Sequence, residues 1–495
     1  EGIVLLKNEA VLPLASGGRA ALFGYAQFHY YQSGTGSGGL VNTAHVPNLP
    51  EVLGGPDGYQ LDAEVQARYA AWLAEHPYEM GTGWAQEPWF QPEMPLDEDF
   101  VRATAQRAET AFIVIGRTAG EDQDNSNTPG SFLLTEGEEN MLALVCRHFK
   151  KSVVLLNVGN IIDMQWVMRY NPGAVAYIWQ GGQEGCRGVL DVLNGTVNPC
   201  GKLPDTIACT PADYPAADHY GADDRNIYAE DIYVGYRYFE TIPGADKAVN
   251  YPFGYGLSYT TFERALVSAE EKQGVIRVRV NVTNTGKYPG KEVMQLYAQA
   301  PQGVLGKAKR VLAAFEKTRL LAQGETQLLT LEAPVAQLAS YDDLGKIQKS
   351  AYVLEKGKYQ FYLGTSVRET EQVFCFTMPE DTVTEQLTAK LVPTSLAERM
   401  LSDGSFEKLP QSEPNDPDYS AIKRVPREES DGFSPAVRAL PGHQIWSQPY
   451  KKDAHIFMEV AEGKITLDEF VTQMTDEELA HILGGQPNTG VANTF

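Results

Sequence analysis

Short runs of apolar, mostly branched residues recur through the first half of the chain. Residues 111–115, 153–156 and 174–178 are such runs, and their lack of polar alternation predicts strands buried on both faces of a parallel sheet. Between the first two runs, Thr135 and Glu138 have capping-box spacing and open an amphipathic helix. Because strand, helix and strand follow one another in this way, the pattern predicts an α/β domain with a parallel sheet.

The hydrophobic period changes after residue 262. Apolar side chains occupy every second position in residues 276–282, 294–297 and 359–363, which is the pattern of strands with one buried face. No obvious reactive cluster accompanies these strands. Residues 263–380 are therefore predicted to form an antiparallel β-sandwich.

The remaining residues are less regular. Residues 381–460 contain charged runs and turn formers such as the Asp403-Gly pair, so we expect a linker there, with some helix at 396–401. Helix signals return in residues 465–474 and 475–483, and a second capping box opens the latter segment.

Composition narrows the possible functions. A chain of 495 residues exceeds what one core organises, so about three domains are expected. A formal net charge of −23 argues against partners that need a basic surface, namely nucleic acids and anionic membranes. No run reaches the roughly 18 apolar residues of a membrane helix. Five widely spaced cysteines without a C-x-x-C pair favour a reducing compartment such as the cytoplasm, and they predict no zinc site.

A tyrosine-rich run over residues 232–240 and 251–262 is the most specific motif of the chain. It holds six tyrosines and three phenylalanines punctuated by glycine. The run resembles the segment that closes the second catalytic domain of glycoside hydrolase family 3. Further blocks resemble the same domain: residues 1–14, 34–39, 156–159, 182–185 and 198–204. The resemblance implies a parallel-sheet α/β sandwich domain over 1–262 and a fibronectin-III-like β-sandwich over 263–380.

The resemblance also implies an unusual domain order. Members of the family commonly begin with a (β/α)8 barrel, whereas here residues 474–480 resemble the opening helix of that barrel. The expected organisation is thus the domain-permuted branch, with a linker over 381–460 and the start of the barrel over 461–495. Since a barrel needs about 250 residues, we expect the chain to stop before the barrel strands.

Two carboxyl groups about 5 Å apart carry out retaining glycoside hydrolysis. By the resemblance, the nucleophile is a barrel aspartate outside this chain, and Gly120-Glu121 matches the acid/base loop, although Asp122 replaces a glycine there. From the residues alone, Glu121 follows a predicted strand at the ligand-binding edge of the sheet, and Asp122 and Asp124 would raise its pKa through like charge. A solvated acidic loop is the open alternative.

The glycine-rich loop 34–39 fits the dinucleotide-binding fingerprint, but no clear helix follows it. A tight turn and a loop that approaches a sugar closely both remain open. The tryptophans between two helical stretches either stack on a sugar at an outer subsite or pack their loop onto the domain. The candidate substrate-binding residues are Ser33, Thr35, Ser37, Trp84, Trp89, Asp122 and Asp124.

The resemblance implies an exo-acting retaining β-glycosidase of the β-glucosidase type, with Glu121 as general acid and base. Its expected partners are a small or oligomeric β-glycoside and the barrel domain of the same protein, and a homo-oligomer remains possible. No cofactor or metal is implied, and the chain by itself is expected to be inactive. The alternative is a non-catalytic carbohydrate-binding or adhesion module.

Overall fold

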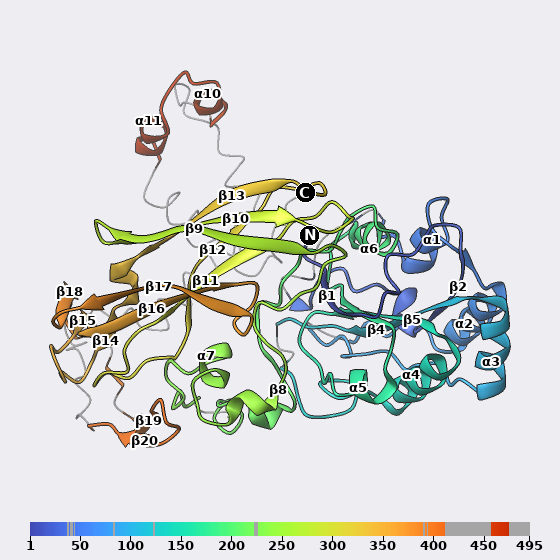
Figure 1. The fold of residues 1–495 in the computed structure, drawn as a ribbon. Helices are drawn as coiled ribbons and strands as arrows, with labels where there is room; N and C mark the ends of the chain where they lie inside the picture. Colours follow the sequence, from blue (N-terminus) through green and yellow to red (C-terminus); the bar gives the residue numbers. More distant parts are fainter. Residues whose placement is uncertain are drawn as a thin grey trace. The chain divides into compact units, whose positions relative to one another are not determined.

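The computed structural model describes residues 1–36, 39, 43, 45–82, 85–121, 124–221, 226–389, 392–393, 395–410 and 457–474. The chain divides into two compact units, Glu1–Gln411 and Ser412–Phe495. The first unit holds an α/β domain and a β-sandwich (Figure 1). All five cysteines are free thiols. No described helix combines the length and the apolar character that crossing a membrane requires.

A six-stranded sheet forms the centre of the α/β domain, in the order β1-β6-β5-β4-β2-β3. Neighbouring strands run parallel except β1, which pairs antiparallel with β6. The strands are β1 (Val4–Asn8), β2 (Arg19–Phe23), β3 (Gln60–Leu61), β4 (Thr110–Arg117), β5 (Lys151–Val158) and β6 (Ala174–Tyr177). The parallel strands predicted from the apolar runs are therefore confirmed as β4, β5 and β6.

Helices cover both faces of this sheet (Figure 1). Alternate residues of β4 point to opposite faces, so Ile113 and Phe112 belong to two separate apolar cores. One core includes side chains of α2 (Ala63–Glu75), α3 (Glu98–Arg107), α4 (Glu136–His148) and α5 (Trp166–Tyr170). The other includes side chains of α1 (Leu49–Leu53) and α6 (Gly185–Leu193). The predicted capping box at Thr135 and Glu138 is confirmed at the start of α4.

Two antiparallel sheets form the β-sandwich, in the orders β13-β10-β9 and β12-β11-β16-β17. In β10 the side chains of Ile276, Val278, Val280 and Val282 are fully buried between the sheets, as their alternation predicts. The strands are β9 (Phe262–Lys272), β10 (Val275–Asn284), β11 (Val293–Gln299), β12 (Val311–Lys317), β13 (Thr326–Pro334), β16 (Gly357–Gly364) and β17 (Thr370–Met378).

Smaller elements border the sandwich and the α/β domain. Strands β14 (Ser340–Asp342), β15 (Ala351–Leu354) and β18 (Thr382–Gln386) form a third sheet, and β7 (Ile207–Ala208) pairs with β8 (Val249–Tyr251). The sandwich end predicted at residue 380 falls just before β18, which pairs with β15. The second unit contains α10 (Phe457–Ala461) and α11 (Leu467–Thr472), and the helix predicted over 475–483 lies outside the described residues.

The helix expected at residues 396–401 is a wrong prediction. Residues Glu398–Met400 form strand β19, which pairs with β20 (Phe406–Lys408) across the turn at Asp403-Gly404. The Met400 amide donates to the Ala229 carbonyl at 2.7 Å, so a contact far away in sequence fixes the extended conformation.

The tyrosine-rich run joins the two domains of the first unit. Tyr236, which begins α7 (Tyr236–Phe239), stacks on Phe253 at 4.4 Å between ring centroids and meets Tyr297 of β11 edge-on at 6.3 Å. Its hydroxyl accepts the amide N–H of Leu312 in β12 at 3.0 Å. The aromatic rings of this run therefore pack the sandwich against the α/β domain.

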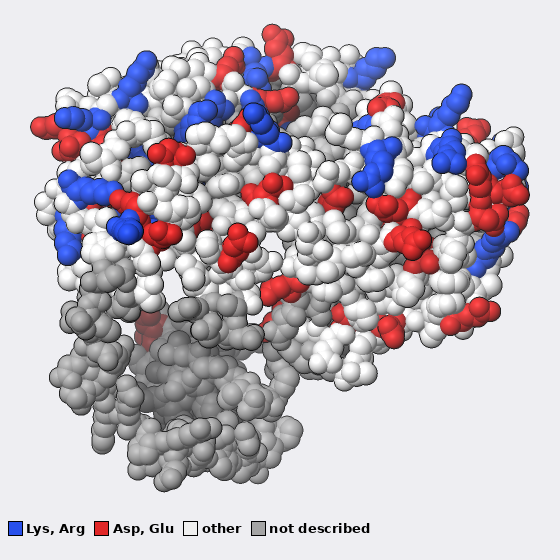
Figure 2. All heavy atoms as spheres, turned by 90° about the horizontal axis from the view of Figure 1, so that it is seen from below, with Lys and Arg blue, Asp and Glu red and all other residues white. Residues whose placement is uncertain are grey.

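Acidic and basic side chains are interspersed over the face of the molecule seen in Figure 2. The described part of this face carries no continuous basic patch (Figure 2).

Candidate active site

The parallel strands β2, β4, β5 and β6 all end at one edge of the sheet. In sheets of this kind ligands bind outside the carboxyl ends of the strands, because the connecting loops gather there. Glu121 lies at this edge, four residues beyond the end of β4, and its side chain is exposed. The structure therefore places the candidate acid/base residue where a substrate can reach it.

The glycine-rich loop lies directly against the segment that carries Glu121. Thr35 and Gly120 form a parallel β-bridge, and the Thr35 amide donates to the Ala119 carbonyl at 2.8 Å. The Thr35 hydroxyl donates to the Glu121 carbonyl oxygen at 3.3 Å. The Gly39 amide donates to the Gly36 carbonyl at 3.1 Å, the bond of a tight turn, so the loop combines a turn with a strand-like contact at Thr35.

A buried ion pair anchors the base of the Glu121 segment. The guanidinium of Arg117, the last residue of β4, donates to both carboxylate oxygens of Glu138 at 2.5 and 2.7 Å. The same guanidinium donates to the carbonyls of Ser131 and Leu133 at 3.2 and 3.3 Å. One guanidinium thus links β4 to α4 and to the residues just before α4. Arginine suits this role because its N–H donors lie in one plane and can bind a carboxylate with two parallel hydrogen bonds.

The far end of the Glu121 segment is held by Asn125. Its side-chain amide donates to the Ile161 carbonyl at 2.9 Å, and its Oδ1 accepts the Ser131 hydroxyl at 3.0 Å. The Tyr220 hydroxyl donates to the Asn125 carbonyl at 3.1 Å. Sequence reasoning did not single out Asn125 or Arg117. No local pattern relates these residues to their partners, which include Ile161, Tyr220 and Glu138.

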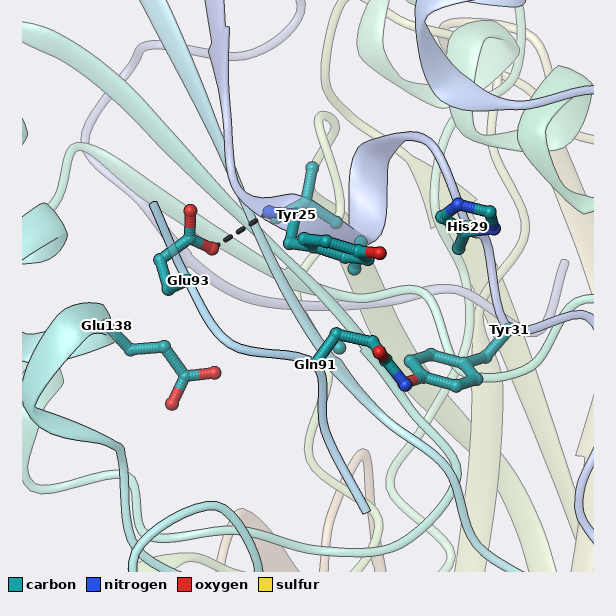
Figure 3. Close-up of a pocket in the computed structure, with 9 residues that line it drawn as sticks. Tyr25, His29, Tyr31, Gln91, Glu93 and Glu138 are labelled. Atoms are coloured by element: carbon teal, nitrogen blue, oxygen red, sulfur yellow. Dashed lines mark hydrogen bonds between the residues drawn. The ribbon is translucent and has the colours of Figure 1, made fainter. Parts of the chain in front are cut away.

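A small cavity is lined in part by Glu138, the carboxylate partner of Arg117 (Figure 3). Glu93 and Glu138 line it on one side, across from His29 and Tyr31. Its volume is about 10 Å³, enough for about one water molecule and far below the roughly 300–1,000 Å³ of ordinary ligand pockets. The cavity is therefore too small to bind a sugar.

Glu93, which lines this cavity, has a carboxyl group with a raised pKa. Burial raises its pKa to about 7, and the nearby Glu138 carboxylate adds to the increase. Three donors oppose the shift: the amides of Tyr25 and Met94 at 2.8 and 2.9 Å, and the Tyr69 hydroxyl at 2.9 Å. Figure 3 shows Glu93 directed at the Tyr25 amide, at the start of the loop after β2.

The structure brings some of the predicted site residues together. Ser33 and Thr35 lie on the loop that contacts Glu121, and Asp124 is exposed three residues beyond it. Trp89 is half-buried, and its carbonyl accepts the Thr118 amide at 3.0 Å, next to the end of β4. The remaining candidates lie outside the described residues: Ser37, Trp84 and Asp122.

Two further residues near this edge make structural contacts. Phe90 packs over the Arg117 guanidinium, 5.6 Å from ring centroid to Cζ, so this aromatic residue holds its loop onto the domain. Glu184 precedes α6 and forms an exposed ion pair with Arg187 at 2.6 Å. Among the described residues, no three His, Cys, Asp or Glu side chains are grouped so that they could hold a metal ion.

Two regions of the chain match known protein families. Residues 3–259 match the glycosyl hydrolase family 3 C-terminal domain, and residues 292–367 match the fibronectin type III-like domain. The chain is 45% identical to a β-glucosidase of Ruminococcus albus, covering 98% of this chain and 49% of that protein. It is 42% identical to β-glucosidase A of Butyrivibrio fibrisolvens, covering 100% of this chain and 65% of that protein.

Solved structures give the same relationship. A β-glucosidase from Paenibacillus barengoltzii superposes with a TM-score of 0.81 at 43% identity, covering 97% of this chain and 52% of that one. β-Glucosidase 3B from Thermotoga neapolitana, in complex with α-D-glucose, superposes with a TM-score of 0.70 at 34% identity, covering 77% and 53%. The chain spans about half to two thirds of the length of these relatives. The match over residues 3–259, more than half of the sequence, shows that the chain belongs to glycoside hydrolase family 3.

Proposed function

We propose that the complete protein hydrolyses terminal, non-reducing β-D-glucosidic bonds with retention of configuration, and that this chain supplies the acid/base residue, Glu121. The observation that carries the proposal is the place of Glu121: exposed, at the carboxyl edge of the parallel sheet, on a segment fastened to its neighbours. The relatives named β-glucosidases support the substrate class.

The proposed mechanism is a double displacement. Glu121 in its acid form donates a proton to the glycosidic oxygen as an aspartate of a (β/α)8 barrel, outside these 495 residues, attacks the anomeric carbon. The ionised Glu121 then removes a proton from the water that cleaves the glycosyl-enzyme intermediate. The two carboxyl groups must lie about 5 Å apart, so the barrel has to cover the edge at which Glu121 lies. The mechanism requires no cofactor.

The remaining candidates support this chemistry in two ways. Asp124, and Asp122 in the sequence, place negative charge close to Glu121 along the chain, and like charge raises the pKa of an acid that must be protonated near neutral pH. We propose that Ser33, Thr35 and Ser37 bind sugar hydroxyls, and that Trp84 and Trp89 present ring faces to an outer subsite.

The test replaces Glu121 in the complete protein and follows aryl β-glucosides of graded leaving-group ability. Glu121→Gln should lower kcat/KM about 10²–10⁴-fold for poor leaving groups and much less for activated ones, because an activated leaving group departs without a proton. Glu121→Ala should regain turnover of activated substrates when azide is added, since azide attacks without a general base. Glu109→Gln is the matched control and should retain activity, because Glu109 is an exposed carboxylate directly before β4, at the opposite edge of the sheet.

The same experiment separates enzymatic function from binding alone. Turnover by the complete protein that is indifferent to Glu121→Gln would reject the acid/base assignment. A complete protein that binds glucosides but never cleaves them would instead be the carbohydrate-binding module. The 495-residue chain by itself should be inactive, and adding the barrel portion should restore hydrolysis.

A further inference from the structure

We propose that Gly36 and Thr35 are positioning residues, which hold the Glu121 carboxyl group in its working orientation. This inference rests on the proposed function of Glu121 and adds to it. It assigns to the glycine-rich loop the task of orienting the proton donor, in addition to any contact that the loop makes with a sugar.

The backbone of the loop is joined to the Glu121 segment. Besides the Thr35–Gly120 bridge and the Thr35 hydroxyl contact to the Glu121 carbonyl, the two segments approach so closely that side chains are excluded between them. A Cβ atom on Gly34 would lie 2.3 Å from the Ala119 carbonyl oxygen, and one on Gly120 would lie 2.6 Å from the Thr35 nitrogen. Only glycine permits this contact, because distances below 3 Å mean overlap.

The side chain of Glu121 lies directly over Gly36. A Cβ atom on Gly36 would be 2.4 Å from the Glu121 Cβ and 2.6 Å from its Oε2. Gly36 also has φ +73°, a conformation that residues with a side chain rarely adopt. The bare Cα of Gly36 is therefore the surface against which the carboxyl group rests, and any side chain there would push the carboxyl group away.

This support is itself tied to the sheet. In the loop after β2, the Tyr31 amide donates to the Asn157 Oδ1 at 2.7 Å, and the Asn157 side-chain amide donates to the Tyr31 carbonyl at 2.9 Å. Asn157 belongs to β5 and is fully buried. The loop that supports Glu121 is thus anchored to β5 at Asn157 and to the extension of β4 at Gly120.

Orientation matters because proton donation is short-ranged. A general acid must come within about 2.6–3.2 Å of the atom that it protonates, and a misplacement of about 1 Å can lower the rate on the order of 100-fold. Gly36→Ala moves the Glu121 carboxyl group without changing its chemical nature. Its effect should therefore resemble a weakened acid/base residue, not a loss of sugar binding.

The test measures Gly36→Ala in the complete protein. We expect kcat to fall about 100-fold for glucosides with poor leaving groups and only a few-fold for activated aryl glucosides, with azide accelerating the activated substrates. The matched control is Gly17→Ala, since Gly17 has a similar φ of +81° and a Cβ there meets nothing within 4 Å. Both variants carry the same kind of backbone strain, but only one displaces Glu121.

Thr35 provides a second variant pair in case Gly36→Ala fails to fold. Thr35→Val should show the same dependence on leaving group to a lesser degree, and Thr35→Ser, which keeps the hydroxyl that bonds the Glu121 carbonyl, should recover it. An equal loss for all leaving groups, or unchanged kinetics in both Gly36→Ala and Thr35→Val, would overturn the proposal. If Glu121→Ala itself lacked leaving-group dependence and azide rescue, the proposed function would fail first, so the two failures are distinguishable.

Discussion

Each domain of the first unit contains a buried ion pair that fixes a connecting segment. The two pairs differ in the segments that they fix. In the α/β domain, Arg117 and Glu138 have side chains only 1% and 7% exposed. In the sandwich, Lys307 and Glu355 are equally buried, at 5% and 4%. Burial of a charged pair is therefore a property of both domains and does not by itself mark a functional site.

The geometry of the two pairs is different. The Arg117 guanidinium reaches Glu138 and the carbonyls of Ser131 and Leu133, so it links β4 to the start of α4 and to the residues just before it. Lys307 forms a single ammonium contact to Glu355, whose other oxygen accepts the Val304 amide at 2.7 Å. The arginine pair supports the segment that carries Glu121, whereas the lysine pair closes the connection between β11 and β12. The same device thus holds the segment of the candidate acid/base residue in one domain and a connection between two strands in the other.

The largest expected effect comes from breaking the arginine pair. Glu138→Gln leaves a guanidinium that cannot lose its proton inside the domain, and this should lower the free energy of unfolding by about 3–5 kcal/mol. Chemical denaturation followed by circular dichroism measures the change. In the complete protein the same variant should also lose activity, because the Glu121 segment loses its anchor. A loss below about 1 kcal/mol would show that the pair contributes little.

Breaking the lysine pair should cost less and leave the chemistry intact. Lys307→Met leaves the buried Glu355 carboxylate without its ammonium partner, but the carboxylate keeps the Val304 amide as a donor, so we expect the free energy of unfolding to fall by about 2–4 kcal/mol. Chemical denaturation followed by circular dichroism measures this loss. The complete protein carrying Lys307→Met should keep its kcat. If kcat fell as much for Lys307→Met as for Glu138→Gln, the two ion pairs would not differ in their importance for activity.

The smallest expected effect is the pH dependence of the free energy of unfolding that comes from Glu93, which lines the small cavity. The pKa of Glu93 is raised from 4.5 to about 7, so between these pH values the folded protein binds a proton that the unfolded chain has released. The unfolding free energy should therefore fall as pH rises from 4.5 to 7, by up to about 3 kcal/mol, since one pKa unit is worth about 1.4 kcal/mol.

Glu93→Gln should remove this part of the pH dependence. Denaturant titrations of both proteins at pH 5 and pH 8 measure it, and Glu75→Gln, at the exposed end of α2, is the matched surface control. Parallel pH profiles for the wild type and Glu93→Gln would contradict the buried-proton interpretation.

Local pattern was enough to predict much of the fold. Strands β4–β6 are continuous apolar runs because both faces of the sheet are covered, and β10 alternates because only one of its faces is. Residues 396–401 show where this reasoning fails. They lack a clear period, and only the β20 partner and the Ala229 carbonyl make part of them extended.

The sequence could predict where the candidate site lies, but not the contacts that hold its residues in place. Glu121 could be found because it follows an apolar strand, and the carboxyl ends of parallel strands meet at one edge. Gly36 is separated from Glu121 by 85 residues in the numbering, and Arg117 from Glu138 by 21. No local period relates such residues, so their contacts remained invisible in the sequence.

The sequence by itself determined the buried strands β4–β6 and β10, the capped start of α4, the order of the two domains in the first unit and the strand end that bears the candidate carboxylate. These features depend on burial patterns, caps and turns within a few residues. The tertiary structure alone decided that Gly36 lies beneath Glu121, that Arg117 clamps the segment to α4 and that the tyrosine-rich run packs the domains together. Contacts between segments that are distant in sequence depend on how whole sheets and loops pack. This packing is set by many residues together, so no local pattern reveals it.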